Sequence, residues 1–191
     1  LFRSKTYLYL KNVPITDENG SPVEYEDVVA GTTLDIHFSG YFLETYPVQI
    51  DGVTGVVITK FGTSSLEFTD FSYQTSEYED AFNFPYQPVS SEKELDKLIN
   101  KYEGLAGLKE KIKADGGFSD DFVYILGGIT EPSGTAKNWV EAVYTDENKL
   151  ALNIESNIYF EGTDDMARWY IAVKIPKAEL KNVDLSKIII V

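Results

Sequence analysis

The sequence predicts a mainly β or α+β fold built from two modules. The first is a small β-barrel or meander, and the second is an α+β domain with a helical hairpin packed on an antiparallel or mixed sheet. Apolar and polar residues alternate with period two over many short segments, whereas helical spacing appears in one region, between residues 91 and 117. The 13 Tyr and 11 Phe residues also suit the pleated, half-buried surface of a sheet.

The first module is predicted from short alternating segments separated by turn-forming residues. In the clearest segment Leu34, Ile36 and Phe38 fall on one face, and polar residues fill the other. Pro47 ends the strand before it, because proline cannot donate to a ladder. Four segments are predicted as strands: residues 4–11, 32–38, 41–45 and 53–61. With a further strand near residues 66–73, this module is expected to span residues 1–75.

Residues 76–87 are predicted as the linker between the modules. The surrounding run has no period and carries two prolines. Exposed, a linker this aromatic would be an adhesive patch. We therefore expect it to be packed down by Phe82, Phe84 and Tyr86, with the second module spanning residues 88–191.

The second module begins with the predicted helical hairpin. Ser91 and Glu94 match a capping box, in which each side chain satisfies an amide of the first helical turn. A first helix over residues 91–103 and a shorter one within residues 104–117 present apolar stripes. Those stripes consist of Leu95, Leu98, Ile99 and Tyr102 in the first helix and of Leu105, Leu108 and Ile112 in the second.

The rest of the second module reads as a sheet. Residues 122–127 are a nearly continuous apolar run, which indicates a strand covered on both faces. Residues 137–144 and 150–155 are predicted to pair as a hairpin, with Leu150, Leu152 and Ile154 facing the core and Ala151 facing away. Further strands are expected over residues 168–175 and 187–191.

Composition narrows the function classes. The formal net charge of −14 argues against a nucleic-acid partner, because phosphate binding needs a basic surface. With no Cys and one His, the chain has no thiolate or Cys/His metal site, and we expect no cofactor. No window approaches the roughly 20 apolar residues of a membrane span. The chain begins at Leu1 rather than Met, so we expect a removed signal peptide or an upstream lipid anchor.

The sequence contains no strong pattern of catalytic residues. Asp35, His37 and Ser39 have the composition of a triad but lie on one strand face, where neighbours are about 7 Å apart. A nucleophile and its base need about 2.6–3.2 Å, so these three cannot form a triad by themselves. The paired carboxylates fall in predicted turns, where acidic residues are expected as turn formers: Asp120-Asp121, Asp164-Asp165, Glu77/Glu79-Asp80 and Asp146-Glu147.

The two tryptophans have different expected roles. Trp169 shares its strand face with three aliphatic residues, so we expect it in the core. Trp139 follows a Gly/Pro-bearing loop and shares its face with Glu141, so we expect it partly exposed. The predicted binding residues are therefore Ser133 and Gly134 of that loop, together with Trp139.

The order of elements in residues 88–191 resembles the PrcB C-terminal-like domain of bacterial secreted and lipid-anchored proteins. The resemblance depends on the helix start Ser91-x-x-Glu94-Leu95, the strand over residues 118–126 and the strand end Ile175-Pro176-Lys177. The family usually carries a Thr-Gly-Gly-Tyr-like loop, where this chain has Pro132-Ser133-Gly134-Thr135. Residues 31–58 are similar to small secreted bacterial domains with an OB-like barrel, which implies an OB-like form for the first module.

These expectations define a function class rather than a reaction. The resemblances imply an extracellular or cell-surface protein of two modules. The sequence is interpreted as a non-catalytic cell-envelope binding or scaffolding protein, with a protein partner such as a protease. The first alternative is a carbohydrate-binding module with a glycan ligand, and the less favoured one is a carboxylate-based hydrolase, which needs two carboxylates across one cleft.

Overall fold

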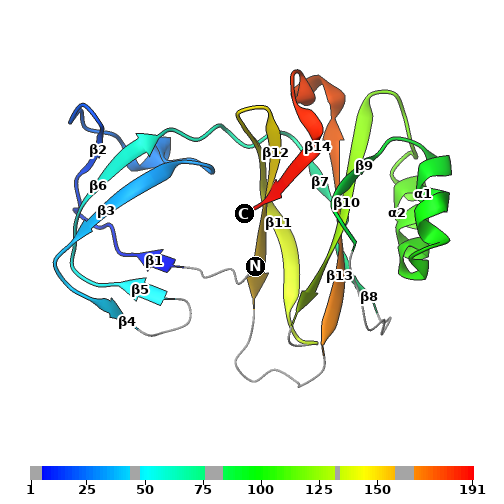
Figure 1. The fold of residues 1–191 in the computed structure, drawn as a ribbon, viewed down its shortest axis with the longest axis horizontal. Coiled ribbons are helices and arrows are strands. Elements are labelled where there is room, and N and C mark those ends of the chain that lie inside the picture. The colour runs from blue at the N-terminus through cyan, green and yellow to red at the C-terminus, as the bar shows by residue number, and fades with distance from the viewer. Residues whose placement is uncertain (1–5, 44–47, 76–83, 132–133, 158–165) are drawn as a thin grey trace. The chain divides into compact units, whose positions relative to one another are not determined.

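The computed structural model describes residues 6–43, 48–75, 84–131, 134–157 and 166–191. The chain divides into two compact units, residues 1–65 and residues 66–191 (Figure 1). Strands hold 48% of the residues and helices 17%, so the predicted mainly β / α+β class is confirmed.

The first unit is a long hairpin that bends from one small sheet into another. Its sheets have the orders β2-β6-β3 and β1-β5-β4. The strands are β1 (Thr6–Leu8), β2 (Ile15–Asp17), β3 (Thr33–Phe38), β4 (Phe42–Leu43), β5 (Val48–Ile50) and β6 (Val53–Lys60). Strand β3 runs antiparallel to β6, and β4 antiparallel to β5, so both arms of the hairpin continue across the bend.

The bend lies where Ser39-Gly40 crosses Asp51-Gly52. The Ser39 amide donates to the Gly52 carbonyl at 2.9 Å, and the Asp51 amide donates to the Tyr41 carbonyl at 3.2 Å. A Cβ on Gly40 would lie 2.5 Å from the Asp51 carbonyl oxygen, so only glycine permits this approach. Gly52 has φ +67°, a conformation that also favours glycine.

Neither sheet of the first unit closes into a barrel, and the strand order is not a meander. Strands β1 and β2 pair in parallel with β5 and β6, which a chain of simple hairpins cannot produce. The connection over residues 18–32 carries the chain from one edge of β6 to the other, with the 3₁₀ turn η1 (Tyr25–Asp27) on the way.

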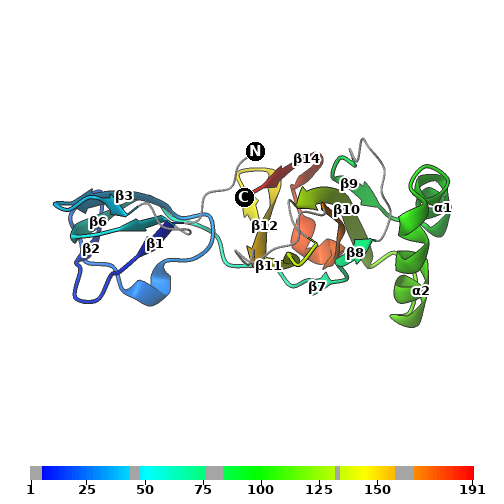
Figure 2. The ribbon, with the colours of Figure 1, turned by 90° about the horizontal axis from the view of Figure 1, so that it is seen from below.

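The second unit has three layers. A five-stranded sheet contains β7 (Thr69–Asp70), β8 (Tyr73–Thr75), β9 (Gln87–Val89), β10 (Phe122–Glu131) and β13 (Ala167–Pro176). One face packs against a three-stranded sheet of β11 (Lys137–Asp146), β12 (Lys149–Asn157) and β14 (Asp184–Ile190), and the other against α1 (Glu92–Ile99) and α2 (Ala106–Ala114). Figure 2 shows the helices on one side of this sheet and the smaller sheet on the other. Short 3₁₀ turns η2 (Glu103–Leu105) and η3 (Lys177–Leu180) join elements.

Strands β10 and β13 are buried on both faces, which explains their nearly continuous apolar sequences. Val123 and Ile125 face the three-stranded sheet, whereas Tyr124 and Leu126 face the helices. The apolar stripe of the helices covers the second face through Leu95, Leu105, Leu108 and Ile112. The predicted helical hairpin on a sheet is therefore confirmed.

The hairpin β11–β12 has the predicted register, with Leu150, Leu152 and Ile154 buried in the core. Ala151, which was expected to face solvent, is fully buried. Its cross-strand neighbours are Tyr144 on one side and Ile189 on the other, and these larger side chains flank the small methyl group.

The segment before the helices belongs to the second unit rather than to a linker. Residues 69–75 pair with β13, and residues 87–89 pair with β10. Phe84 is buried beneath the helices, and the Tyr86 ring lies where a Cβ on Gly127 would stand. The unit boundary thus falls at residues 65/66, ten residues earlier than expected, and Phe82 lies outside the described residues.

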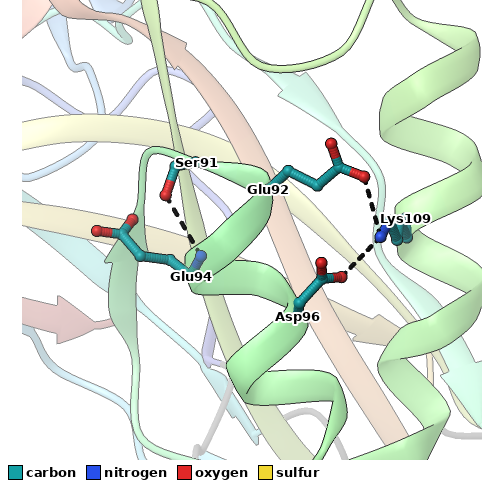
Figure 3. Close-up of polar contacts among 5 residues, drawn as sticks. All are labelled: Ser91, Glu92, Glu94, Asp96 and Lys109. Carbon is teal, nitrogen blue, oxygen red and sulfur yellow. Dashed lines mark hydrogen bonds and ion pairs between the residues drawn. The ribbon is translucent and has the colours of Figure 1, made fainter.

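The start of α1 has the predicted cap, except that the Glu94 side chain bonds to the amide of Ser90 instead of that of Ser91. The Glu94 amide donates to Ser91 Oγ at 3.3 Å (Figure 3), while Glu94 Oε2 accepts from the amide of Ser90 at 2.8 Å. Lys109 of α2 reaches Asp96 at 2.7 Å and Glu92 at 2.9 Å on α1. These hydrogen bonds, that to Asp96 first, raise the pKa of Lys109 to about 12.

Candidate functional site

Exposed aromatic side chains concentrate in the first unit. Of the seven found among the described residues, only Trp139 lies in the second unit. The other six are Tyr9, Tyr25, Phe38, Tyr41, Phe42 and Phe61. Single exposed apolar residues need no explanation, but a concentration of large ones marks a surface for interaction.

Three of these side chains form what we term the corner cluster: Phe38, Tyr41 and Phe42, beside the bend of the hairpin. The rings of Phe38 and Phe42 meet edge to face, with centroids 5.2 Å apart. Tyr41 and Phe42 are 66% and 57% exposed. Alternation predicts that Phe38 faces the core with Leu34 and Ile36, but a register shift between His37 and Phe38 ends the alternation, and Phe38 is exposed.

Two more of the exposed aromatic residues border a second feature, the first-unit groove. This open groove has a volume of about 620 Å³. It is lined by Leu8, Tyr9, Leu10, Lys11, Val13, Ile15, Val23, Glu24 and Tyr25. All of these come from two short segments. Residues 8–15 lead from the end of β1 to the start of β2, and residues 23–25 follow β2 in the chain.

Local turns bring the two walls of the groove together. On one side the Val13 amide donates to the Leu10 carbonyl at 3.0 Å, which closes a turn with Asn12 at φ 64°. On the other side Asp17 Oδ1 accepts from the amides of Asn19 and Ser21, at 2.9 and 2.8 Å. The chain then returns antiparallel to β2.

After this return, the Val23 amide donates to the Ile15 carbonyl at 2.9 Å. The hydrogen bond places residues 23–25 beside β2. Tyr9 and Tyr25, sixteen positions apart in the sequence, thereby come to border the same groove.

The groove has an apolar floor and a polar rim. Leu10, Val13, Ile15 and Val23 line it and also pack in the small core of the first unit. The rim carries the phenol rings of Tyr9 and Tyr25, 79% and 65% exposed, together with one cation and one anion, Lys11 and Glu24. Such a surface can stack a flat apolar face and hydrogen-bond polar groups around its edge.

Of the binding residues predicted from sequence, Gly134 lies in the turn before β11 and Trp139 lies on β11. Trp139 is 38% exposed, as predicted, but its indole nitrogen donates to Glu141 Oε2 at 2.8 Å. The Gly134 carbonyl accepts from Gln74 Nε2 at 3.1 Å, and Ser133 lies outside the described residues. Trp169 is buried in the core of the two facing sheets, as predicted.

The residues with the composition of a triad are exposed and unconnected to one another by any described hydrogen bond. Asp35 and His37 lie on the exposed side of β3, and the Ser39 hydroxyl donates to the Gly52 carbonyl at 3.5 Å. Asp120 and Asp121 are exposed, while the pairs at 77–80 and 164–165 lie outside the described residues. Within the described part of the chain, no three His, Asp or Glu residues come together as a metal site.

The side-chain amide of Asn138 is buried without a hydrogen-bond partner among the described residues. Asn138 on β11 is 5% exposed, and neither its side-chain oxygen nor its nitrogen has a partner. It shares the inward face of β11 with Val140, which belongs to the core between the sheets. The indole nitrogen of Trp169 in the same unit is likewise without a partner in the described structure.

No family model, curated protein or solved structure matches the chain. None of the described helices has the length and apolar character that crossing a membrane would require.

Proposed function

We propose that this chain is a non-catalytic binding or scaffolding protein of the cell envelope and that its first unit carries the recognition surface. The observation that carries the proposal is that six of the seven exposed aromatic side chains among the described residues lie in that unit. Aromatic residues are enriched at interfaces because each buries a large area at a small cost in conformational entropy.

Within that surface the corner cluster is the best anchor for a protein partner. Two contacting phenylalanines and a tyrosine lie at the bend, where the backbones of Gly40 and Gly52 approach closely. Binding energy in interfaces concentrates on a few such anchors. The resemblance of the second unit favours a protease among such partners.

The net charge of the chain limits the partner further. At −14 it favours neutral or basic partners over anionic ones. The groove contributes one carboxylate, Glu24, among its lining residues, whereas glycoside hydrolysis usually employs two. Binding therefore fits the surface better than hydrolysis does.

Co-sedimentation of the full chain with a bacterial envelope fraction tests the proposal. The wild-type chain should pellet with the fraction, and the triple variant Phe38→Ser, Tyr41→Ser, Phe42→Ser should remain in the supernatant. A matched control, Trp139→Ser, removes an exposed aromatic residue from the second unit and should pellet like the wild type.

Circular dichroism of all three proteins checks that they are folded. Failure of the wild-type chain to pellet, or equal retention of wild type and triple variant, would contradict the proposal.

A further inference from the structure

The groove of the first unit has features that the corner cluster lacks. The corner cluster consists of two phenylalanine rings and a tyrosine and has no charged member. The groove is concave, and its rim combines two phenols with an ammonium and a carboxylate. These differences point to a separate ligand of different chemistry.

From this geometry we propose that the groove binds an uncharged saccharide, with the rings of Tyr9 and Tyr25 stacking on its sugar faces. The inference deepens the proposed function and depends on it for the role of the first unit as the recognition module. The inference assigns a ligand class to the groove, whose features protein binding by the corner cluster does not explain.

Charge is the first argument for a neutral ligand. Lys11 and Glu24 are the two charged residues among those lining the groove, and their charges cancel. An anionic ligand would meet a carboxylate at the rim and a protein of net charge −14 around it. A cationic ligand would be attracted by the net charge of the protein but would meet the Lys11 ammonium at the rim. A neutral ligand meets neither penalty.

The distribution of polar and apolar atoms is the second argument. A sugar ring presents C–H groups on its faces and hydroxyl groups around its edge. The groove offers the apolar side chains of Leu10, Val13 and Val23 below and two exposed tyrosine rings at the rim. Lys11 can donate hydrogen bonds to hydroxyl groups, and Glu24 can accept them.

Size is the third argument. A volume of about 620 Å³ falls in the usual range of small-ligand sites, roughly 300–1,000 Å³. The groove is open rather than enclosed, so a short oligosaccharide could extend beyond it in either direction. An open site that leaves part of its ligand in water should bind weakly, and the test is designed for weak binding.

The experiment is a titration of the isotopically labelled full chain with neutral trisaccharides, followed by ¹⁵N–¹H correlation spectra. The probes are N,N′,N″-triacetylchitotriose, cellotriose and maltotriose at millimolar concentrations, and trigalacturonate serves as the anionic comparison. At least one neutral probe should shift amide signals of residues 8–25 and leave those of residues 137–157 unchanged. Trigalacturonate should bind more weakly than that probe.

Three variants locate the site. Tyr9→Ala and Tyr25→Ala should each weaken binding by about tenfold, because each removes a stacking surface. Phe61→Ala is the matched control: it removes an exposed aromatic residue of the same unit that lies in neither the groove lining nor the corner cluster, and it should bind the saccharide like the wild type. Unchanged spectra away from each substitution establish that the variants are folded.

Each outcome decides the inference. No shift with any neutral probe, shifts outside residues 8–25, tighter binding of trigalacturonate, or unchanged affinity in both groove variants would overturn it. The proposed function is tested separately: the corner-cluster variant can lose envelope binding while no saccharide binds, which removes the inference and keeps the proposed function. Saccharide binding without envelope binding would keep the assignment of the groove and remove the proposed function.

Discussion

Replacing Asn138 with leucine should stabilise the second unit. The amide of Asn138 is 95% buried and meets no hydrogen-bond partner among the described residues, while its neighbour on the same strand face packs in the core. Leaving a buried polar group unsatisfied costs about 1–3 kcal/mol, and an apolar side chain of similar shape removes that cost. We expect the free energy of unfolding to rise by about 1–2 kcal/mol.

Urea unfolding followed by tryptophan fluorescence measures this change. Both tryptophans of the chain, Trp139 and Trp169, lie in the second unit, so the signal reports that unit alone. With a slope of about 1–3 kcal/mol per M urea, the midpoint should rise by roughly 0.3–2 M. Asn138→Asp is the matched comparison and should lower the midpoint, because it puts a carboxylate in the same place.

A leucine variant that is less stable than the wild type by 1 kcal/mol or more would contradict this prediction. That result would show that the folded protein satisfies the Asn138 amide, for example through a buried water molecule.

Three further predictions concern the fold. Leu152→Asp should unfold the second unit, because it removes a fully buried side chain and places a charge in the core between the sheets; a thermal melt like that of the wild type would contradict the assigned register. Gly127→Ala should cost about 1–3 kcal/mol by overlap with the Tyr86 ring, and the loss should shrink in a Tyr86→Ala background, as a double-mutant cycle would measure. The raised pKa of Lys109 implies a contribution to stability that is complete below about pH 10.5 and is lost as the pH rises through about 12; Lys109→Met should remove this part of the pH dependence in urea titrations, and an unchanged profile would count against the ion pairs with Asp96 and Glu92.

The sequence predicts the second unit well wherever the apolar pattern is local. Burial of β10 on two faces follows from its continuous apolar run, and the register of β11–β12 follows from strict alternation in residues 150–154. The α1 cap follows from two residues three positions apart. Each of these features is encoded within about ten consecutive residues.

The features that the sequence does not predict depend on distant partners. Strands β2 and β7 are three residues or fewer, and each pairs with a longer strand far along the chain, β6 and β13 respectively. Strand β1 is equally short and pairs with β5, which has three residues as well. Strands of two or three residues are too short to show a periodic apolar pattern. The pattern alone therefore does not locate the boundary between the units, which lies just before β7.

The sequence does not predict the groove either, because the groove also depends on pairing between distant segments. Turn-forming residues around Asn19 and Gly20 were recognisable, but a turn does not specify which side chains it brings together. The parallel pairing of β2 with β6 and the hydrogen bond from Val23 to Ile15 decide that Tyr9 and Tyr25 share one groove. The available signal was the high tyrosine content, which indicates either sheet packing or a stacking surface.

Hydroxyl-radical footprinting of the full chain, with and without the bacterial envelope fraction, tests most directly whether the first unit is the recognition surface. The proposed function predicts that the fraction protects Phe38, Tyr41 and Phe42 from oxidation, while Trp139 and Met166 of the second unit react as before. Protection of Trp139 and Met166 with no change at the corner cluster would contradict it.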